Sequence, residues 1–94
     1  MDRKYYMSTE EAIGFAGMLL DDHDGQIAIT EKVRVVITDI YKQLLSSEAD
    51  EAYVLGTDKN ISALESCLCE PMSAAAREAI DVLYGAACAI CNGW

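Results

Sequence analysis

The sequence predicts an all-α fold, a small bundle of four to five short helices that occupies residues 1–94 as a single domain. Three observations support this prediction. Hydrophobic residues make up 52% of the chain, which is typical of a folded protein. Only one proline and six glycines interrupt a sequence in which alanine, glutamate and leucine are common. Apolar residues also recur at spacings of three and four, the period of a helix that buries one face.

The first helix is expected to run from near Ser8 to about Leu20. Ser8 followed three residues later by Glu11 fits a capping box, in which each side chain accepts a hydrogen bond from a backbone N–H group of the other residue. Gly14 and Gly17 lower the helix propensity of this segment. Both glycines are therefore predicted to let another helix approach closely.

The second helix is expected to begin at Thr30, a good N-cap residue. Its apolar positions recur at helical spacing and continue through the segment YKQLL. The β-branched run VRVVITDI is the competing signal, because such residues are enriched in strands. We prefer a helix, and a strand over 27–40 would replace the bundle by a fold with a hairpin. The apolar positions of the predicted helix are Val33, Val36, Ile37, Ile40, Tyr41 and Leu44.

Two further helices are expected before the only proline. The stretch SSEADEAYVLG is predicted to form a short helix that is capped at 46–47 and ends at Gly56. The next helix starts near Asp58. It must end before Pro71, because the residue that precedes a proline avoids helical geometry.

The last helix is expected over 73–91, with Asn92-Gly93 as its C-cap. This segment is apolar nearly all round, and after Asp81 it carries no charge. Such a helix is usually buried on several sides. Either it is the central helix of the bundle, or part of it faces a second copy of the chain. The second alternative is a structural homodimer closed by the 73–91 helix.

The formal net charge of −9, from 16 acidic and 7 basic residues, argues against direct binding of nucleic acid. It suits a protein partner with a basic surface, or it serves solubility alone. Two acidic regions are the candidate partner-binding residues, and the sequence does not say whether they merge into one surface. They are Asp21, Asp22 and Asp24 in the first region, and Glu48, Asp50, Glu51 and Asp58 in the second.

The sequence contains no recognisable set of catalytic residues. The only histidine, His23, lies in an acidic cluster, and no glycine-rich phosphate loop is present. The function we expect is therefore that of a small, acidic, non-catalytic protein-binding module. It would act as an inhibitor or adaptor of the kind that phages and mobile elements encode. We expect a cytoplasmic location and no membrane contact, because no apolar run approaches the roughly 20 residues of a membrane span.

The stretch DDHDGQIAITE resembles an EF-hand calcium loop in its pattern DxDGxIxxxE. With Gly25 as the sixth position, the resemblance assigns oxygen ligands to Asp22, Asp24, Gln26 and Glu31. It departs from the EF-hand pattern at the first ligand position, where Leu20 has no side-chain oxygen, and at the ninth, where Ala28 stands. This gives an alternative function, a helix-loop-helix protein with a degenerate EF-hand-like loop at 20–31 that binds a cation weakly.

A plain helix-to-helix turn accounts for most of the same residues. Asp24 and Gly25 suit the backbone of a turn, Ile27 would fill the core beneath it, and Thr30 and Glu31 would cap the next helix. No cofactor is expected, apart from a weakly held calcium ion if this loop binds one.

Four cysteines form two close pairs, Cys67-Leu-Cys69 and Cys88-Ala-Ile-Cys91. Such pairs raise the question of a structural zinc site. Free cysteine also packs as a small hydrophobic residue in protein cores. We expect core packing for these residues, with a zinc site or redox chemistry as alternatives.

Overall fold

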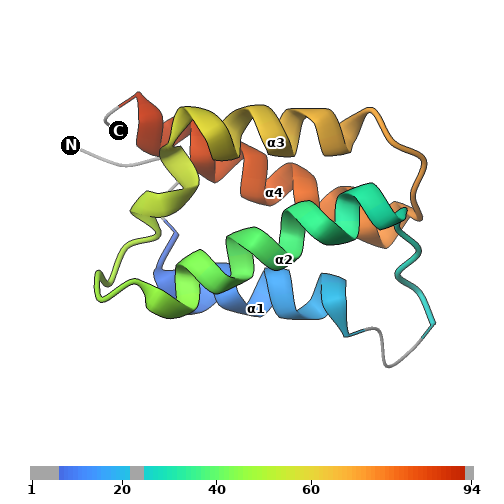
Figure 1. Ribbon diagram of the computed structural model, residues 1–94, viewed down its shortest axis with the longest axis horizontal. Helices are drawn as coiled ribbons and strands as arrows, with labels where there is room; N and C mark the ends of the chain where they lie inside the picture. The colour runs from blue at the N-terminus through green and yellow to red at the C-terminus, as the bar shows by residue number, and fades with distance from the viewer. Residues whose placement is uncertain (1–6, 22–24, 93–94) are drawn as a thin grey trace.

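The computed structural model describes residues 7–21 and 25–92 and arranges them as an up-and-down bundle of four helices (Figure 1). None of the described residues belongs to a β-strand, so the predicted all-α class is confirmed. The elements are α1 (Thr9–Leu20), α2 (Glu31–Ser46), the 3-10 helix η1 (Tyr53–Gly56), α3 (Asp58–Leu68) and α4 (Ala74–Cys91).

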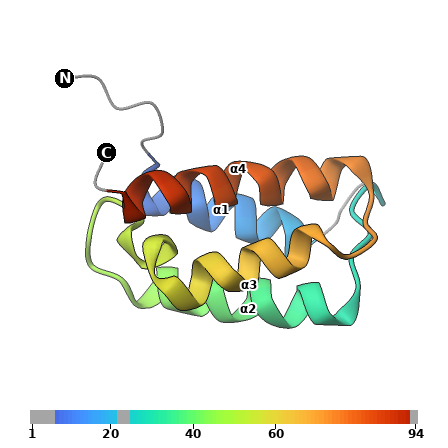
Figure 2. The same cartoon turned by 90° about the horizontal axis from the view of Figure 1, so that it is seen from above.

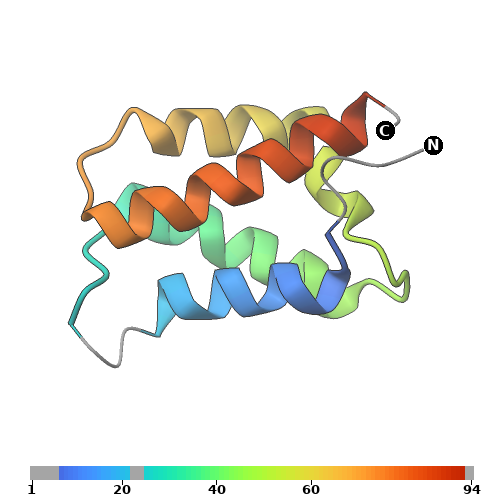
Figure 3. The same ribbon diagram turned by 180° about the vertical axis from the view of Figure 1, so that it is seen from behind.

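The four helices form two layers. Each helix contacts the one that follows it in the sequence, and α4 returns to contact α1. Seen from above, α1 and α4 lie in one layer and α2 and α3 in the other (Figure 2). The view from behind shows α1 and α4 together at the front (Figure 3). Consecutive helices are antiparallel, so the 21–30 and 69–73 connections share one end of the bundle, and the 47–57 connection lies at the other.

The first turn of α1 carries the predicted capping box. The Ser8 hydroxyl accepts from the Glu11 N–H at 3.0 Å, and the Glu11 carboxylate accepts from the Ser8 N–H at 3.2 Å. The prediction for the two glycines is wrong for Gly14, which is exposed and has room for an added Cβ. At Gly17 an added Cβ would lie 3.8 Å from the ring of Tyr41, so this face of α1 contacts α2.

The β-branched run forms α2, as preferred, and not a strand. The Thr30 hydroxyl caps the helix by accepting from the Val33 N–H at 3.2 Å. Four apolar side chains then follow at helical spacing and are fully buried, namely Val33, Ile37, Ile40 and Leu44. Burial of a Val, Leu or Ile side chain stabilises by about 1.5–3 kcal/mol. That exceeds the few tenths of a kcal/mol by which Val and Ile disfavour a helix.

The predicted short helix capped at 46–47 is wrong. Ser46 is still the last residue of α2, Ser47 ends it in an extended conformation, and only Tyr53–Gly56 turn again, as η1. The backbone between them binds α1 instead. The Asp50 carbonyl accepts from the Thr9 N–H at 2.7 Å, and the Ala49 carbonyl accepts from the Thr9 hydroxyl at 2.7 Å. These carbonyls satisfy the start of α1 and are not used in a helix of their own.

Helix α4 is buried on several sides within one copy of the chain. It contacts α3, η1 and α1. These contacts account for its apolar composition, so a second copy is not required to explain it, and the homodimer stays a prediction. The buried residues of α4 are Ala76, Ala79, Ile80, Leu83, Ala86, Ala87 and Ala89.

Among the described residues two polar side chains are buried, Thr9 at the start of α1 and, more deeply, Asn60. Asn60 on α3 is 1% exposed, and its amide N–H group donates to the Val54 carbonyl of η1 at 2.6 Å and to the Gln43 carbonyl oxygen of α2 at 2.9 Å. Gln43 donates back to Asn60 at 3.2 Å and also to Asp39 at 2.9 Å. Asn60 therefore joins three elements by hydrogen bonds.

Within residues 7–21 and 25–92, every helix is too short or too polar to cross a bilayer.

Candidate partner-binding surface

The start of α1 and the connection after α2 form one acidic end of the bundle. Besides the bonds from Thr9 to residues 49 and 50, the Ala52 N–H donates to the Met7 carbonyl at 3.1 Å, and Ser8 and Glu51 form an isolated antiparallel bridge. This backbone pairing holds the 47–52 connection beside the first turn of α1. Acidic side chains from both segments are thereby brought to the same end, namely Glu10, Glu11, Glu48, Asp50 and Glu51.

The charges are distributed unequally between the helices. Residues 7–21 and 47–52 contain six acidic residues and no basic one. Helix α2 carries Lys32, Arg34 and Lys42 against two acidic residues, Glu31 and Asp39. The negative charge of the described chain is therefore concentrated on α1 and the connection bound to it. We call the five that share one end of the bundle the acidic surface; it comprises Glu10, Glu11, Glu48, Asp50 and Glu51, whereas Asp21 lies at the other end of α1.

Two exposed apolar side chains lie on α1 and α4, the two helices of one layer. Met18 is 43% exposed, and it follows Gly17, which faces α2, so Met18 points away from α2. Val82 is 39% exposed, and it lies two residues before Tyr84, which contacts α3. It therefore lies on the α1 side of α4. Both helices belong to the layer at the front of Figure 3.

Asp21, the described member of the first acidic region, lies apart from the second region. Asp21 follows the last residue of α1, whereas Glu48, Asp50 and Glu51 lie beside its first turn. Twelve helical residues separate the two regions, which corresponds to roughly 18 Å at 1.5 Å per residue. Asp58 begins α3 at the same end of the bundle as residues 48–51. Asp22 and Asp24 lie outside the described residues.

The described part of the EF-hand-like stretch forms hydrogen bonds with the start of α4. Gln26 is exposed, and Glu31 is the first residue of α2. Between them the Ala28 N–H donates to the Ser73 hydroxyl and the Ala28 carbonyl accepts from the Ser73 N–H, both at 3.0 Å. This pairing ties the stretch to the start of α4. Leu20, at the first ligand position, is a half-buried residue of α1.

Gly25 has the conformation that a turn requires. Its φ is +71°, a left-handed value that favours glycine. Among the residues that the structure describes, no three potential metal-ligating side chains come together. Asp22, His23 and Asp24 fall outside that part of the chain, so weak cation binding stays a prediction.

The two cysteine pairs lie at opposite ends of the bundle. Cys67 and Cys69 are at the C-terminal end of α3, and Cys88 and Cys91 are at the C-terminal end of α4, which runs antiparallel to it (Figure 1). One zinc ion therefore cannot be held by all four. The prediction of core packing is confirmed for Cys67, which is buried, but it is wrong for Cys69 and Cys91, which are exposed.

Burial raises the pKa of the Cys67 thiol from 9.0 to about 11, although the Lys32 ammonium opposes part of this shift. The pKa of Cys67 is higher in the folded than in the unfolded chain, so the buried neutral thiol makes its full contribution to stability below about pH 9. That contribution is lost as the pH rises through about 11. We expect the free energy of unfolding to fall more steeply over this range in the wild type than in Cys67→Ala. Urea titrations at several pH values measure this. Equal slopes would contradict the assignment.

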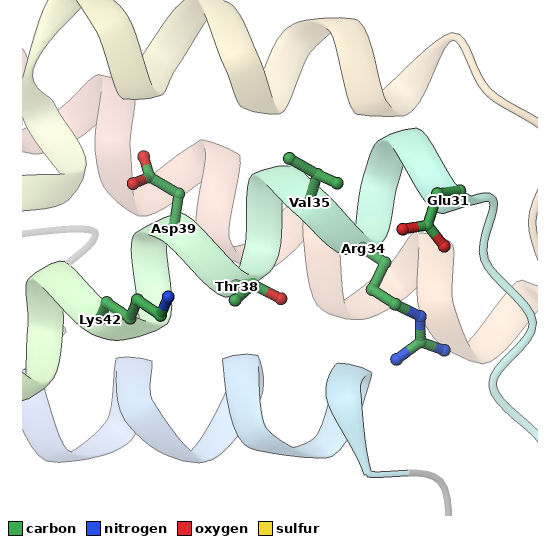
Figure 4. A pocket seen from close by; sticks show the side chains of 6 residues that line it. All are labelled: Glu31, Arg34, Val35, Thr38, Asp39 and Lys42. Atoms are coloured by element: carbon green, nitrogen blue, oxygen red, sulfur yellow. The ribbon is translucent and has the colours of Figure 1, made fainter.

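A hollow of about 340 Å³ lies on the outer side of α2 (Figure 4). All of its lining residues come from this one helix, and charged groups of both signs border it. A depression made by a single helix is open to solvent and does not enclose a ligand. It therefore gives no support to a catalytic or cofactor site. The lining residues are Glu31, Arg34, Val35, Thr38, Asp39 and Lys42.

The comparisons with known proteins add no candidate. Neither a protein-family model, nor a curated protein, nor a solved structure matches this chain. The surface chemistry of the chain itself is therefore the basis for its function.

Proposed function

We propose that this chain is a small non-catalytic protein-binding module, an inhibitor or adaptor that docks its acidic surface on a basic partner. The observation that carries the proposal is the unequal distribution of charge. Residues 7–21 and 47–52 hold six acidic residues without one basic residue, while α2 holds charges of both signs. The negative electrostatic potential of these residues would attract a positively charged partner and orient its approach.

The apolar side chains suggest the kind of partner. Charge alone accelerates association, but desolvated apolar contacts at the centre of an interface usually supply most of the affinity. Met18 and Val82 are exposed on the two helices of one layer and can offer such contacts. The long aliphatic stems of lysine and arginine can cover apolar side chains while their charged ends meet carboxylates. The partner that fits is therefore an amphipathic segment rich in Lys or Arg.

A helical peptide of lysine and leucine serves as a probe of this surface. We expect Glu10→Gln/Asp50→Asn to weaken its binding roughly fivefold at low salt, since each exposed ion pair contributes about 0.2–1 kcal/mol. Both substitutions keep the backbone contacts of the fold, because the bond from Asp50 to Thr9 uses the Asp50 backbone carbonyl. Glu10 lies in the first turn of α1, so its neutralisation should cost only a few tenths of a kcal/mol to about 1 kcal/mol of stability. Fluorescence anisotropy of the labelled peptide measures the affinity.

The matched control removes two charges from the side where α3 and α4 meet. Glu65 lies on α3, and Asp81 lies between Arg77 and Tyr84 on the stripe of α4 that contacts α3. Glu65→Gln/Asp81→Asn has the same net charge as the test variant and should bind nearly as well as the wild type. Equal weakening by both variants would reduce the effect to net charge, and binding that ignores salt would exclude an electrostatic interface.

A further inference from the structure

Two cysteines share one stripe of α4 in its last turns. Cys88 is half-buried and Cys91 is exposed, and both are free thiols. The stripe continues one turn back to Tyr84, whose hydroxyl donates to the Glu65 carboxylate at 3.1 Å. The neighbouring Cys88 side chain and the Glu65 carboxylate raise the pKa of Tyr84 to about 12. The Tyr84 contacts place this stripe toward α3.

The spacing of the two thiols allows them to act together. Residues three apart on a helix are neighbours, with about 5–6 Å between their Cβ atoms. Each sulfur can turn inward from its Cβ, so one ion between the two side chains can bond to both. The helix already fixes this geometry, because the Asn92 N–H closes the last turn on the Cys88 carbonyl at 3.0 Å. A ligand therefore has little conformational entropy to remove.

The other cysteine pair provides an internal comparison. Cys67 and Cys69 are two residues apart, so at 3.6 residues per turn they point to different sides of α3. Cys67 is buried in the core, whereas Cys69 is exposed. The same number of thiols is thus present at both ends of the bundle, but only the pair on α4 can converge on one ligand.

We propose that Cys88 and Cys91 form a two-thiolate site for a thiophilic metal or metalloid ion. Thiolates are soft ligands and select soft ions such as Cu(I). With a trivalent arsenical the reaction is a condensation without oxidation or reduction. Each sulfur forms one bond to arsenic, the arsenic–oxygen bonds break, and the two thiol protons leave with the oxygen as water. Both protons stay in the water that forms, so this condensation releases no proton to solution. A Cu(I) ion instead displaces the two thiol protons, and its binding therefore strengthens as the pH rises.

Phenylarsine oxide is the probe for this site. The reduced protein is mixed with one equivalent in the presence of excess glutathione and analysed by native mass spectrometry. An arsenical held by one thiol exchanges with glutathione, whereas one held by two thiols persists because the second bond forms intramolecularly. We expect one persistent adduct per chain for the wild type and for Cys69→Ser. We expect none for Cys88→Ser or Cys91→Ser.

Circular dichroism distinguishes a preformed site from capture of an unfolded chain. The adduct should form with the helical signal unchanged, and it should raise the melting temperature of the wild type but not of Cys88→Ser. Three results would overturn the proposal. They are a persistent adduct in Cys88→Ser, its loss in Cys69→Ser, or an adduct that forms only together with loss of helix.

Discussion

Replacement of Asn60 by leucine is expected to destabilise the fold by roughly 3 kcal/mol, although leucine is more apolar and a good helix former. The Asn60 amide is 1% exposed and supplies hydrogen bonds to the Val54 carbonyl of η1 and to Gln43 of α2. Leucine removes the Asn60 donor and leaves the Val54 carbonyl with only the longer bond from the Thr57 hydroxyl at 3.3 Å. A buried polar group that loses its partner costs about 1–3 kcal/mol, and the Gln43 pair adds to this.

Urea denaturation followed by circular dichroism measures the loss. Ser62→Ala is the control, because Ser62 is an exposed residue of the same helix, and it should change stability by less than about 0.5 kcal/mol. In a double-mutant cycle with Gln43→Leu, the two losses should not add, since the residues share two hydrogen bonds. A loss below about 1 kcal/mol for Asn60→Leu would show that solvent or a neighbour satisfies the carbonyl.

Two glycine-to-alanine substitutions are expected to change stability in opposite directions. At Gly56 an added Cβ would meet the Ile90 Cγ2 atom at 2.6 Å and the Cys91 backbone nitrogen at 3.1 Å. Overpacking of this kind costs about 1–3 kcal/mol, so Gly56→Ala should destabilise the fold by about 2 kcal/mol. At Gly14 an added Cβ meets nothing within 4 Å, in the middle of α1. Gly14→Ala should therefore stabilise by about 0.5–1 kcal/mol.

Thermal and urea unfolding of both variants test this pair. Ile90→Ala removes the Cγ2 atom that the methyl group added by Gly56→Ala would strike, so the double variant should be more stable than the sum of the single losses predicts. A destabilised Gly14→Ala would contradict the open space at that position. A neutral Gly56→Ala would show that η1 can move away from α4 without cost.

The helices could be predicted because their signals are local. The capping box of Ser8 and Glu11, the Thr30 cap and the apolar spacing of α2 are all readable within one or two turns. The prediction of a short helix at 46–56 was wrong because the interactions that decide this segment are not local. The residues that compete for its carbonyl groups, Thr9 above all, lie 40 positions away in the sequence.

The candidate surface was only partly accessible from the sequence. Charge counts indicated an acidic surface, but they could not reveal that Asp21 and Asp50 lie at opposite ends of α1, because this depends on chain topology. Asn60 was missed, since a single amide in a polar stretch carries no signal of burial. Burial of the cysteines was likewise predicted from residue type, whereas helix phase decides it, as Cys67 and Cys69 demonstrate.

The bonds at the two ends of the bundle have a consequence for the order of folding. Thr9 reaches Ala49 across 40 residues, and Ala28 reaches Ser73 across 45, while the packing of α1 on α2 and of α3 on α4 joins helices that are consecutive in the sequence. Each helical hairpin can close over a short loop, but these end contacts require both hairpins to be in place. We therefore expect these end contacts to form late in folding. Because they couple the two locally encoded hairpins, the hairpins should unfold as one cooperative unit.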